Sequence, residues 1–300
     1  MDLRAIAMGL SFALMWSSAF TSARIIVAHA PPMASLSLRF LISGVIALAL
    51  ARMMGQSWRL TRAQWKATVI FGICQNALYL GLFFIAMQWI EAGLASIIAS
   101  TMPLMVGLFG WIALGERLRP LAIGGLVLGV IGAALIMGTR ISGGADLTGI
   151  AICILGTAAL AVATLSARGA SGGGNVMTVV GYQMLIGAAA LAIAAGIFED
   201  WQVSWSPSLL YAFAYTVLVP GVAATWIWFL LVNRIGAVKA ATFHFLNPFF
   251  GVLVAAIILG EAIGPLDLVG VAIVAAGILA VQLSRQKTVA VTREPVKPAA

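Results

Sequence analysis

Charged residues are scarce in this chain of 300 residues: 9% are charged, whereas 62% are hydrophobic. A soluble domain normally carries about a quarter charged residues, so this composition excludes an ordinary soluble fold. Apolar runs of about 20 residues, each long enough to cross a bilayer, recur from end to end. We therefore expect an all-α integral membrane protein.

Cysteines and metal-binding patterns are also almost absent. Cys74 and Cys153 lie in apolar segments without CxxC spacing, and we interpret them as packing residues. There is no HExxH motif, no P-loop and no cluster of metal ligands. The loop Gly143-Gly144-Ala145-Asp146 resembles that of an aspartyl protease, but its Asp lacks an intramembrane acidic partner. We expect no enzyme, metal or cofactor; an intramembrane enzyme or a structural membrane protein is the non-transporter alternative.

Ten apolar segments have the length of transmembrane helices. They are Ala5–Val27, Met33–Met54, Ala67–Gln88, Gly93–Leu114, Leu121–Met137, Leu147–Ala167, Val176–Ile197, Leu209–Val232, Val238–Leu259 and Leu266–Leu283. The first is too long for the apolar region of a signal peptide and is expected to be retained.

The formal net charge of +8 arises mainly between these segments. Basic loop residues orient membrane proteins, so we interpret the charge in this way and expect no nucleic-acid partner. They gather in the loops after even-numbered segments and at the two ends of the chain, which predicts cytoplasmic termini. The residues are Arg4, Arg52, Arg59, Arg62, Lys66, Arg117, Arg119, Arg168, Arg234, Arg285, Lys287, Arg293 and Lys297. Segment 285–300 lacks apolar periodicity and is predicted to be a disordered cytoplasmic tail.

Two stretches of the chain are similar to each other. Residues Ile90–Met137 align without a gap onto Ile235–Gln282. The matches include Pro103 on Pro248, Gly115-Glu116 on Gly260-Glu261, Pro120 on Pro265, Gly125 on Gly270 and Gly132 on Gly277. The chain is therefore interpreted as two five-helix units, residues 1–140 and 141–284. Because five is odd, the second unit enters the membrane from the opposite side, and the prediction is two inverted repeats around a central cavity.

The repeated Gly-Glu-Pro element is explained by turn chemistry. Glycine closes one helix at a left-handed cap, and proline suits the first turn of the next helix. A glutamate just before that turn is expected to face a positive helix N-terminus. Gly125, Gly129 and Gly132 share one helix face, a small-residue pattern that predicts close helix packing.

The same segments carry a family resemblance. The chain resembles the EamA branch of the drug/metabolite transporter superfamily, and is similar to its YddG-type exporters of aromatic and other neutral amino acids. The resemblance is carried by MWSSAF at Met15–Phe20, PPMASLSLRF at Pro31–Phe40, ALYLGLFFIAMQWIEAGLASIIASTMP at Ala77–Pro103 and the LGERL that follows. It implies a central cavity between two repeats, a bacterial inner-membrane location and export of a small metabolite.

The chain departs from the small multidrug exporters, which use an intramembrane glutamate for proton exchange. Its acidic residues fall in loops or at helix ends, which favours facilitated diffusion over proton antiport. His244 keeps open the alternative, a proton-coupled exporter of drugs or other metabolites, because the unperturbed pKa of histidine lies near physiological pH.

Three prolines lie in the middle of predicted helices: Pro103, Pro220 and Pro248. Each removes a backbone N–H and frees a carbonyl, and broken helices at corresponding positions of two repeats point to a transport site. Polar and aromatic residues with helical spacing surround them. The candidate substrate-binding residues are Trp16, Ser17, Phe20, Gln75, Tyr79, Ser96, Ser100, His244 and Asn247. For a single serine or tryptophan, interhelical bonding or core packing is the competing interpretation.

Three further residues are left open. Trp226 and Trp228 face either lipid or the cavity. Arg39 is interpreted first as a structural tether that extends toward the outer surface, and second as a partner of a substrate carboxylate. The expected site is aromatic, lined with hydroxyls and weakly charged, which suits a neutral amino acid. A single chain is expected to function as a monomer in the lipid bilayer, because both repeats are fused.

Overall fold

The computed structural model describes residues 3–115, 119–142, 144–166, 175–235, 240 and 242–291, and the regular elements in these ranges are all helices. The helices are α1 (Leu3–Val27), α2 (Pro32–Met53), α3 (Arg62–Phe71), η1 (Gly72–Tyr79), α4 (Leu80–Ala86), α5 (Ala92–Ser100), α6 (Met102–Leu114), α7 (Pro120–Ser142), α8 (Leu147–Ser166), α9 (Val176–Phe198), α10 (Pro207–Thr216), η2 (Val217–Ala223), α11 (Ala224–Ile235), η3 (Thr242–Leu246), α13 (Asn247–Leu259) and α14 (Pro265–Val291).

Eight stretches among the described residues are long and apolar enough to cross a membrane. Ten were expected, and the other two are shorter apolar helices at Pro120–Ile136 and Phe243–Leu259. At the C-terminal end, α14 continues to Val291 although the sequence predicts a disordered tail from residue 285. Residues 286–291 contain no glycine or proline, so nothing in their sequence stops the helix. Residues 292–300 lie outside the described part of the chain.

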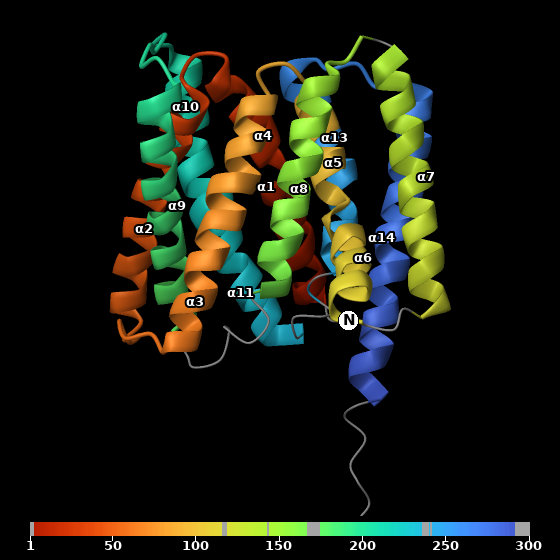
Figure 1. The fold of residues 1–300 in the computed structure, drawn as a ribbon, viewed down its shortest axis with the longest axis horizontal. Helices are drawn as coiled ribbons and strands as arrows, with labels where there is room; N and C mark the ends of the chain where they lie inside the picture. Colours follow the sequence, from red (N-terminus) through yellow and green to blue (C-terminus); the bar gives the residue numbers. More distant parts are fainter. Residues whose placement is uncertain are drawn as a thin grey trace, which may run out of the picture.

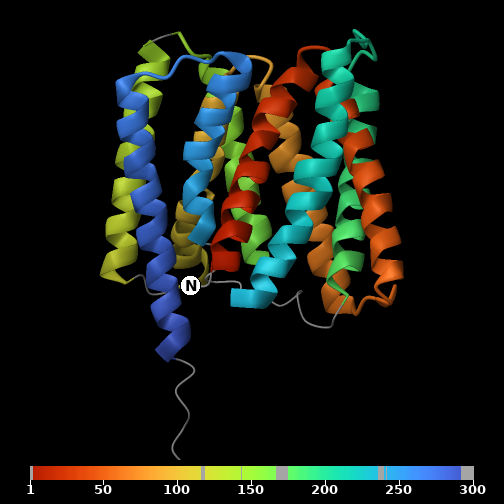
Figure 2. The ribbon, with the colours of Figure 1, turned by 180° about the vertical axis from the view of Figure 1, so that it is seen from behind.

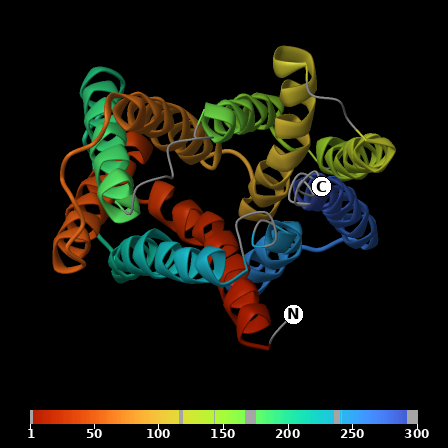
Figure 3. The same ribbon diagram turned by 90° about the horizontal axis from the view of Figure 1, so that it is seen from below.

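The helices stand side by side in an upright bundle (Figure 1). Helix α2 packs along α9, and α7 packs along α14; the two pairs lie at opposite ends of the bundle (Figures 1 and 3). Between them, α1 lies beside α10–α11 and α13, which Figure 2 shows from behind. We call the end that holds the α1–α2 connection the upper end, as drawn in Figure 1, and the end with the N-terminus the lower end.

Glycine allows α7 and α14 to approach each other closely. A Cβ atom built on Gly125 would lie 2.7 Å from the carbonyl oxygen of Gly277, and one on Gly132 would lie 2.8 Å from the amide nitrogen of Val274. Gly129, which shares that face of the helix, packs against Leu104 of α6. The predicted small-residue face is therefore a helix contact, in which backbones meet without intervening side chains.

The chain is interrupted at all three predicted prolines. Between α5 and α6 the break falls at Thr101 (φ −75°, ψ −6°), two residues before Pro103. The equivalent break falls at Leu246 (φ −85°, ψ −12°), two residues before Pro248. Pro220 lies inside η2, a π-helical segment. A proline inside a helix lacks the N–H that would continue the ladder, which explains why these helices bend or divide.

The Gly-Glu-Pro elements end two helices as predicted, and the glutamate of the second element also caps a helix distant in the sequence. Gly115 (φ 64°) and Gly260 (φ 70°) form left-handed caps of α6 and α13. The carboxylate of Glu261 accepts hydrogen bonds from the backbone N–H groups of Ala92 (2.7 Å) and Gly93 (2.8 Å). It therefore caps α5, far away in the sequence, as well as preceding α14. The repeat mate of Glu261, Glu116, lies outside the described residues.

Candidate functional site

A small enclosed cavity lies among α1, α2, η1, α4 and η2. Four of the predicted residues line it together, namely Trp16, Phe20, Tyr79 and Pro220, and Arg39 lies in the same wall. Its volume is about 30 Å³, which is enough for roughly one water molecule. We call it the central cavity.

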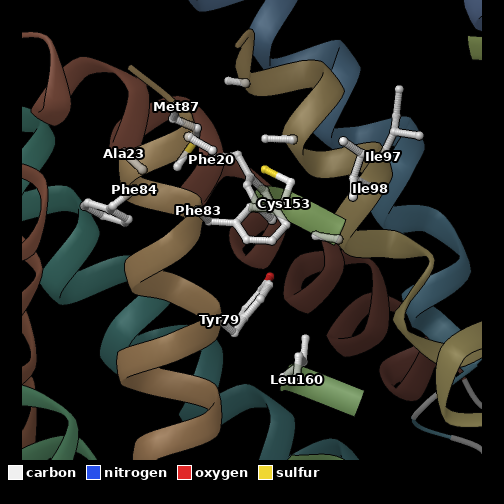
Figure 4. Packing of buried hydrophobic residues seen from close by; sticks show 14 of the residues in the cluster. Phe20, Ala23, Tyr79, Phe83, Phe84, Met87, Ile97, Ile98, Cys153 and Leu160 are labelled. Atoms are coloured by element: carbon white, nitrogen blue, oxygen red, sulfur yellow. The ribbon is translucent and has the colours of Figure 1, made fainter. Parts of the chain in front are cut away.

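Aromatic rings form the wall of the central cavity on the side of the η1–α4 helix. Tyr79 and Phe83 lie one helical turn apart with ring centroids separated by 4.8 Å, and Phe20 of α1 lies 5.9 Å from Phe83. Figure 4 shows these three rings close together, with Phe84 and Met87 farther along the same helix. Tyr79 is 2% exposed, so its ring is held by packing on all sides. The wall offers flat apolar surface, which suits an aromatic or aliphatic ligand group.

Arg39 is the cation in this wall. Its side chain is only 7% exposed, and within the described part of the chain its buried Nε atom has no hydrogen-bond partner. Its guanidinium carbon lies 5.1 Å from the ring centroid of Phe40, the next residue. The interpretation of Arg39 as a tether reaching toward the surface is wrong, because a side chain that reached water would not be buried.

Two π-helical segments, η1 and η2, flank the central cavity. The numbering offset between their starts, 217 − 72 = 145, equals that between the repeated prolines, 248 − 103 = 145.

Gln75 lies in η1, half-buried, and is not among the residues that line the cavity. Its neighbour Asn76 donates a hydrogen bond to the carbonyl oxygen of Gln183 in α9 (2.9 Å). Single-turn π-helices often occur at functional sites, and apolar periodicity in the sequence does not reveal them.

His244 and Asn247 form a second group of predicted residues, below the central cavity. The Nδ1 atom of His244 and the Nδ2 atom of Asn247 are 3.0 Å apart. The imidazole ring lies 5.2 Å from Phe12, 6.5 Å from Trp16 and 5.3 Å from Trp228 between ring centroids. Trp16 thus belongs to both groups and connects them. Trp228 packs in this cluster, whereas Trp226 is exposed.

The predicted serines lie at helix crossings. Ser96 is fully buried where α5 meets α13, faces Gly251, and donates to the carbonyl oxygen of Asn247 (3.3 Å). Ser100 donates to the carbonyl oxygen of Ser96 (2.7 Å). Ser17 is fully buried in α1, and its hydroxyl has no hydrogen-bond partner among the described residues. Ser96 and Ser100 therefore hold helices together in this conformation, and they do not line the central cavity.

A larger hollow of about 490 Å³ opens at the upper end of the bundle. It is lined by the α1–α2 connection, the end of α4 and residues 198–204, with His29, Gln88, Glu199 and Asp200 among its polar groups. We call it the upper vestibule. Ala23, which lines the central cavity, lies one helical turn below the vestibule residue Val27, and Met87 of the cavity directly precedes Gln88 of the vestibule. A short layer of packed side chains thus separates the two spaces.

Acidic residues are kept away from the central cavity. Those that the structure describes lie in loops or at helix ends: Glu91, Asp146, Glu199, Asp200, Glu261 and Asp267. Within the described ranges no three His, Cys, Asp or Glu side chains come together in a group that could hold a metal ion. The chemistry available in the cavity is therefore one guanidinium group, one phenol, one indole N–H, and aromatic and aliphatic surface.

A bundle of apolar helices that breaks around a small cavity with an aromatic and aliphatic lining has the form of a membrane transporter. The chain belongs to the EamA-like transporter family of the drug/metabolite transporter superfamily, whose family model matches residues 3–138 and again residues 147–283. The family resemblance of the sequence is thereby confirmed.

Several relatives are named as transporters, and one solved structure has a similar fold. The chain is 26% identical to the uncharacterized transporter YvbV of Bacillus subtilis, over 83% of this chain and 81% of that protein. It is 25% identical to the uncharacterized inner membrane transporter YedA of Escherichia coli K12, over 92% and 90%. The aromatic amino acid exporter YddG of Ancylobacter novellus is 29% identical over 45% of this chain and 46% of that protein. A crystal structure that is 23% identical shares the fold, with a TM-score of 0.68 over 96% of this chain and 99% of the other.

Proposed function

We propose that this transporter exports small neutral metabolites, chiefly aromatic and other neutral amino acids, by alternating access and facilitated diffusion. The observation that carries the proposal is the central cavity, where Trp16 and Phe20 of α1, Tyr79 of η1 and Pro220 of η2 converge. Its aromatic wall suits an apolar or aromatic side chain. The partial match to an aromatic amino acid exporter supports the same substrate class.

We propose further that the fold is a ten-helix bundle of two inverted repeats, 1–140 and 141–284. The helix contacts support this, because α1 contacts α10–α11 and α13, whereas α8 contacts η1–α4 and α5–α6. Exchanging the two halves converts one set of contacts into the other. Helix α1 begins at the lower end and α8 begins at the upper end, as expected for an inverted second half (Figure 1).

The size of the two spaces suggests which step of the cycle this conformation represents. The central cavity of about 30 Å³ is far too small for an amino acid, whereas the upper vestibule of about 490 Å³ has the size of a ligand pocket. The substrate site is therefore closed here, and rocking of the two repeats about the central cavity is needed to open it.

The proposed setting is a bacterial inner membrane, with both termini in the cytoplasm and the upper vestibule outside. Basic residues at the lower end, including Arg52, Arg62 and Arg234, support this orientation by the positive-inside rule. A relative described as an inner membrane transporter supports the location. Since one chain supplies both repeats, we propose that it functions as a monomer.

The direct test is transport by the purified protein in proteoliposomes. Uptake and counterflow of labelled tryptophan, threonine and methionine would be compared for the wild type, Tyr79→Ala and His244→Ala. Tyr211→Ala is the matched control, because Tyr211 is 77% exposed and far from the cavity lining. We expect saturable transport that Tyr79→Ala weakens about tenfold or more and Tyr211→Ala leaves unchanged. Folded wild-type protein that transports none of the three would contradict the proposed substrate class.

Proton-coupled export is the second candidate, and His244 is the observation that favours it. Its imidazole lies between the aromatic cluster and Asn247, next to the helix break at Leu246. Movement of the helices at this break would change the surroundings of the imidazole and therefore its affinity for a proton. Substrate-dependent pH change in sealed proteoliposomes that disappears in His244→Ala would support antiport. Transport that is unaffected by a pH gradient would support facilitated diffusion.

A further inference from the structure

Arg39 is a buried cation that the fold leaves without a partner. Its guanidinium group forms no ion pair or hydrogen bond with any residue that the structure describes. It lies seven residues below the start of α2 at Pro32, which corresponds to a depth of about 10 Å. An ionised side chain at such a position is costly, and intramembrane charges of this kind usually mark a substrate or ion pathway.

Arg24, in the last turn of α1, is an arginine with a structural role and can be compared with Arg39. Arg24 lies in α1, is half-buried, and donates a hydrogen bond to the carbonyl oxygen of Met87, just beyond the end of α4. A cation at the C-terminal end of a helix is satisfied by the unpaired carbonyls there. Arg24 therefore completes a contact between two helices, whereas Arg39 lies in the wall of a cavity with its donors free.

We propose that Arg39 binds the carboxylate of the transported ligand, and that the ligand needs an aromatic or apolar body but not an amine. The geometry that carries this proposal is a single guanidinium group beside the rings of Trp16, Tyr79 and Phe83 in the central cavity. The transport step of this proposal rests on the proposed function. Binding of a carboxylate at Arg39 can be tested without transport.

A carboxylate is the anion that fits this site best. The planar fork of arginine matches a carboxylate with two parallel hydrogen bonds. A phosphate monoester carries about two charges and usually requires several cations, and Arg39 is the only Lys or Arg among the residues that line the cavity. The walls around it are aromatic and aliphatic, so the rest of the ligand must be apolar.

The lining of the central cavity also explains why the ligand does not need an amine. No Asp or Glu is among the residues around the central cavity, and the acidic groups that the structure describes lie at helix ends or in loops. An ammonium group would gain at most hydrogen bonds to neutral oxygen atoms, beside a cation that repels it. Carboxylic acids that lack the amine are therefore expected to be recognised as well as the amino acids.

Three indole compounds test the proposal on the wild-type protein: tryptophan, indole-3-propionate, which lacks the amine, and tryptamine, which lacks the carboxylate. Binding is measured in detergent as protection against heat, which requires no transport. We expect tryptophan and indole-3-propionate to protect and tryptamine not to. Protection by tryptamine equal to that by tryptophan, or none by indole-3-propionate when tryptophan protects, would overturn the proposal.

Variants then test the residue itself. Arg39→Gln should weaken binding of both carboxylates about 10- to 100-fold, and Arg39→Lys should weaken it less because the charge remains. Arg24→Gln is the control and should change affinity little. Without ligand, Arg39→Gln should melt no lower than the wild type, since an unpaired buried charge is removed, whereas Arg24→Gln should melt lower. Unchanged affinity in Arg39→Gln would refute the role of Arg39.

Transport separates this proposal from the proposed function. If proteoliposomes take up no tryptophan but carboxylates still protect the wild type and not Arg39→Gln, the export function is wrong and the carboxylate site stands. If tryptophan is transported with unchanged apparent affinity by Arg39→Gln, the export function stands and the carboxylate site is wrong.

Discussion

Glu199 provides a sharp test of how the upper end of the bundle is held together. Its two carboxylate oxygens accept hydrogen bonds from the backbone N–H groups of Met33 (2.7 Å) and Ala34 (2.8 Å) in the first turn of α2. Pro31, at the N-cap position, provides no side-chain hydrogen bond to this helix end. A glutamate from the α9–α10 connection thus replaces a local cap, and it joins the second half of the chain to the first.

The cost of Glu199→Gln can be estimated from these two bonds. Glutamine keeps one acceptor oxygen but presents an NH₂ group to the other N–H, and the favourable charge at the helix N-terminus is lost. A lost cap costs about 0.5–2 kcal/mol and the charge at a helix end about 0.3–1 kcal/mol. Because Glu199 is half-exposed, solvent screening reduces the sum, and we expect a loss of about 1–2 kcal/mol. For a chain of this size that corresponds to a melting temperature lower by about 2–3 °C.

The assay is the fraction of detergent-purified protein that survives heating, measured by size-exclusion chromatography. Asp200→Asn is the matched control, because Asp200 is the next residue and is exposed, and none of the described residues binds its carboxylate. This control should lie within about 0.5 kcal/mol of the wild type. Equal melting temperatures for Glu199→Gln and Asp200→Asn would refute the idea that Glu199 caps α2.

Two further substitutions test the packing of the bundle. Gly125→Ala should destabilise the protein by about 1–3 kcal/mol, because the added methyl group meets the backbone of Gly277; Gly124→Ala has open space and should be neutral or slightly stabilising in the same heating assay. Asn76→Ala should cost about 0.6–1.7 kcal/mol through loss of its interhelical hydrogen bond, with a smaller change for Gln75→Ala, and melting temperatures of the two variants measure the difference. A larger loss of stability in Gly124→Ala than in Gly125→Ala, or in Gln75→Ala than in Asn76→Ala, would contradict the contacts described.

Features that depend on local chemistry were predicted well from the sequence. The break before Pro103 and the one before Pro248 follow from a missing N–H, which is a property of the proline itself. The left-handed caps at Gly115 and Gly260 likewise follow from the absence of a side chain. Such features need no knowledge of what lies beside the helix, and apolar segments of about 20 residues are recognised for the same reason.

Features that depend on a distant partner were missed or misassigned. The sequence placed Glu261 before the turn of its own helix, and only the packed bundle brings its carboxylate to α5. The prediction for Arg39 failed in the same way, since its burial depends on α1, η1 and η2 around it. No periodic pattern distinguishes a π-helical segment from an α-helix, so η1 and η2 were not foreseen. Ser96 was named as a site residue from its helix face, and whether substrate ever reaches it stays a prediction.

The proposed repeats have corresponding helix starts at nearly constant offsets but different side chains at the site, and this difference bears on how one substrate would be held. Helices α2 and α9 begin 176 − 32 = 144 residues apart, so the counterpart of Arg39 is Gln183, which carries no charge. At the offset of 145, the counterpart of Pro220 is Gln75. A symmetric backbone allows the two halves to exchange conformations at little cost, because each state reuses the same helix contacts. In the proposed site, a cation on one side of the cavity alone would give a bound carboxylate a single preferred orientation. The substrate would then keep its orientation while the helices move around it, with Arg39 as the point that stays attached.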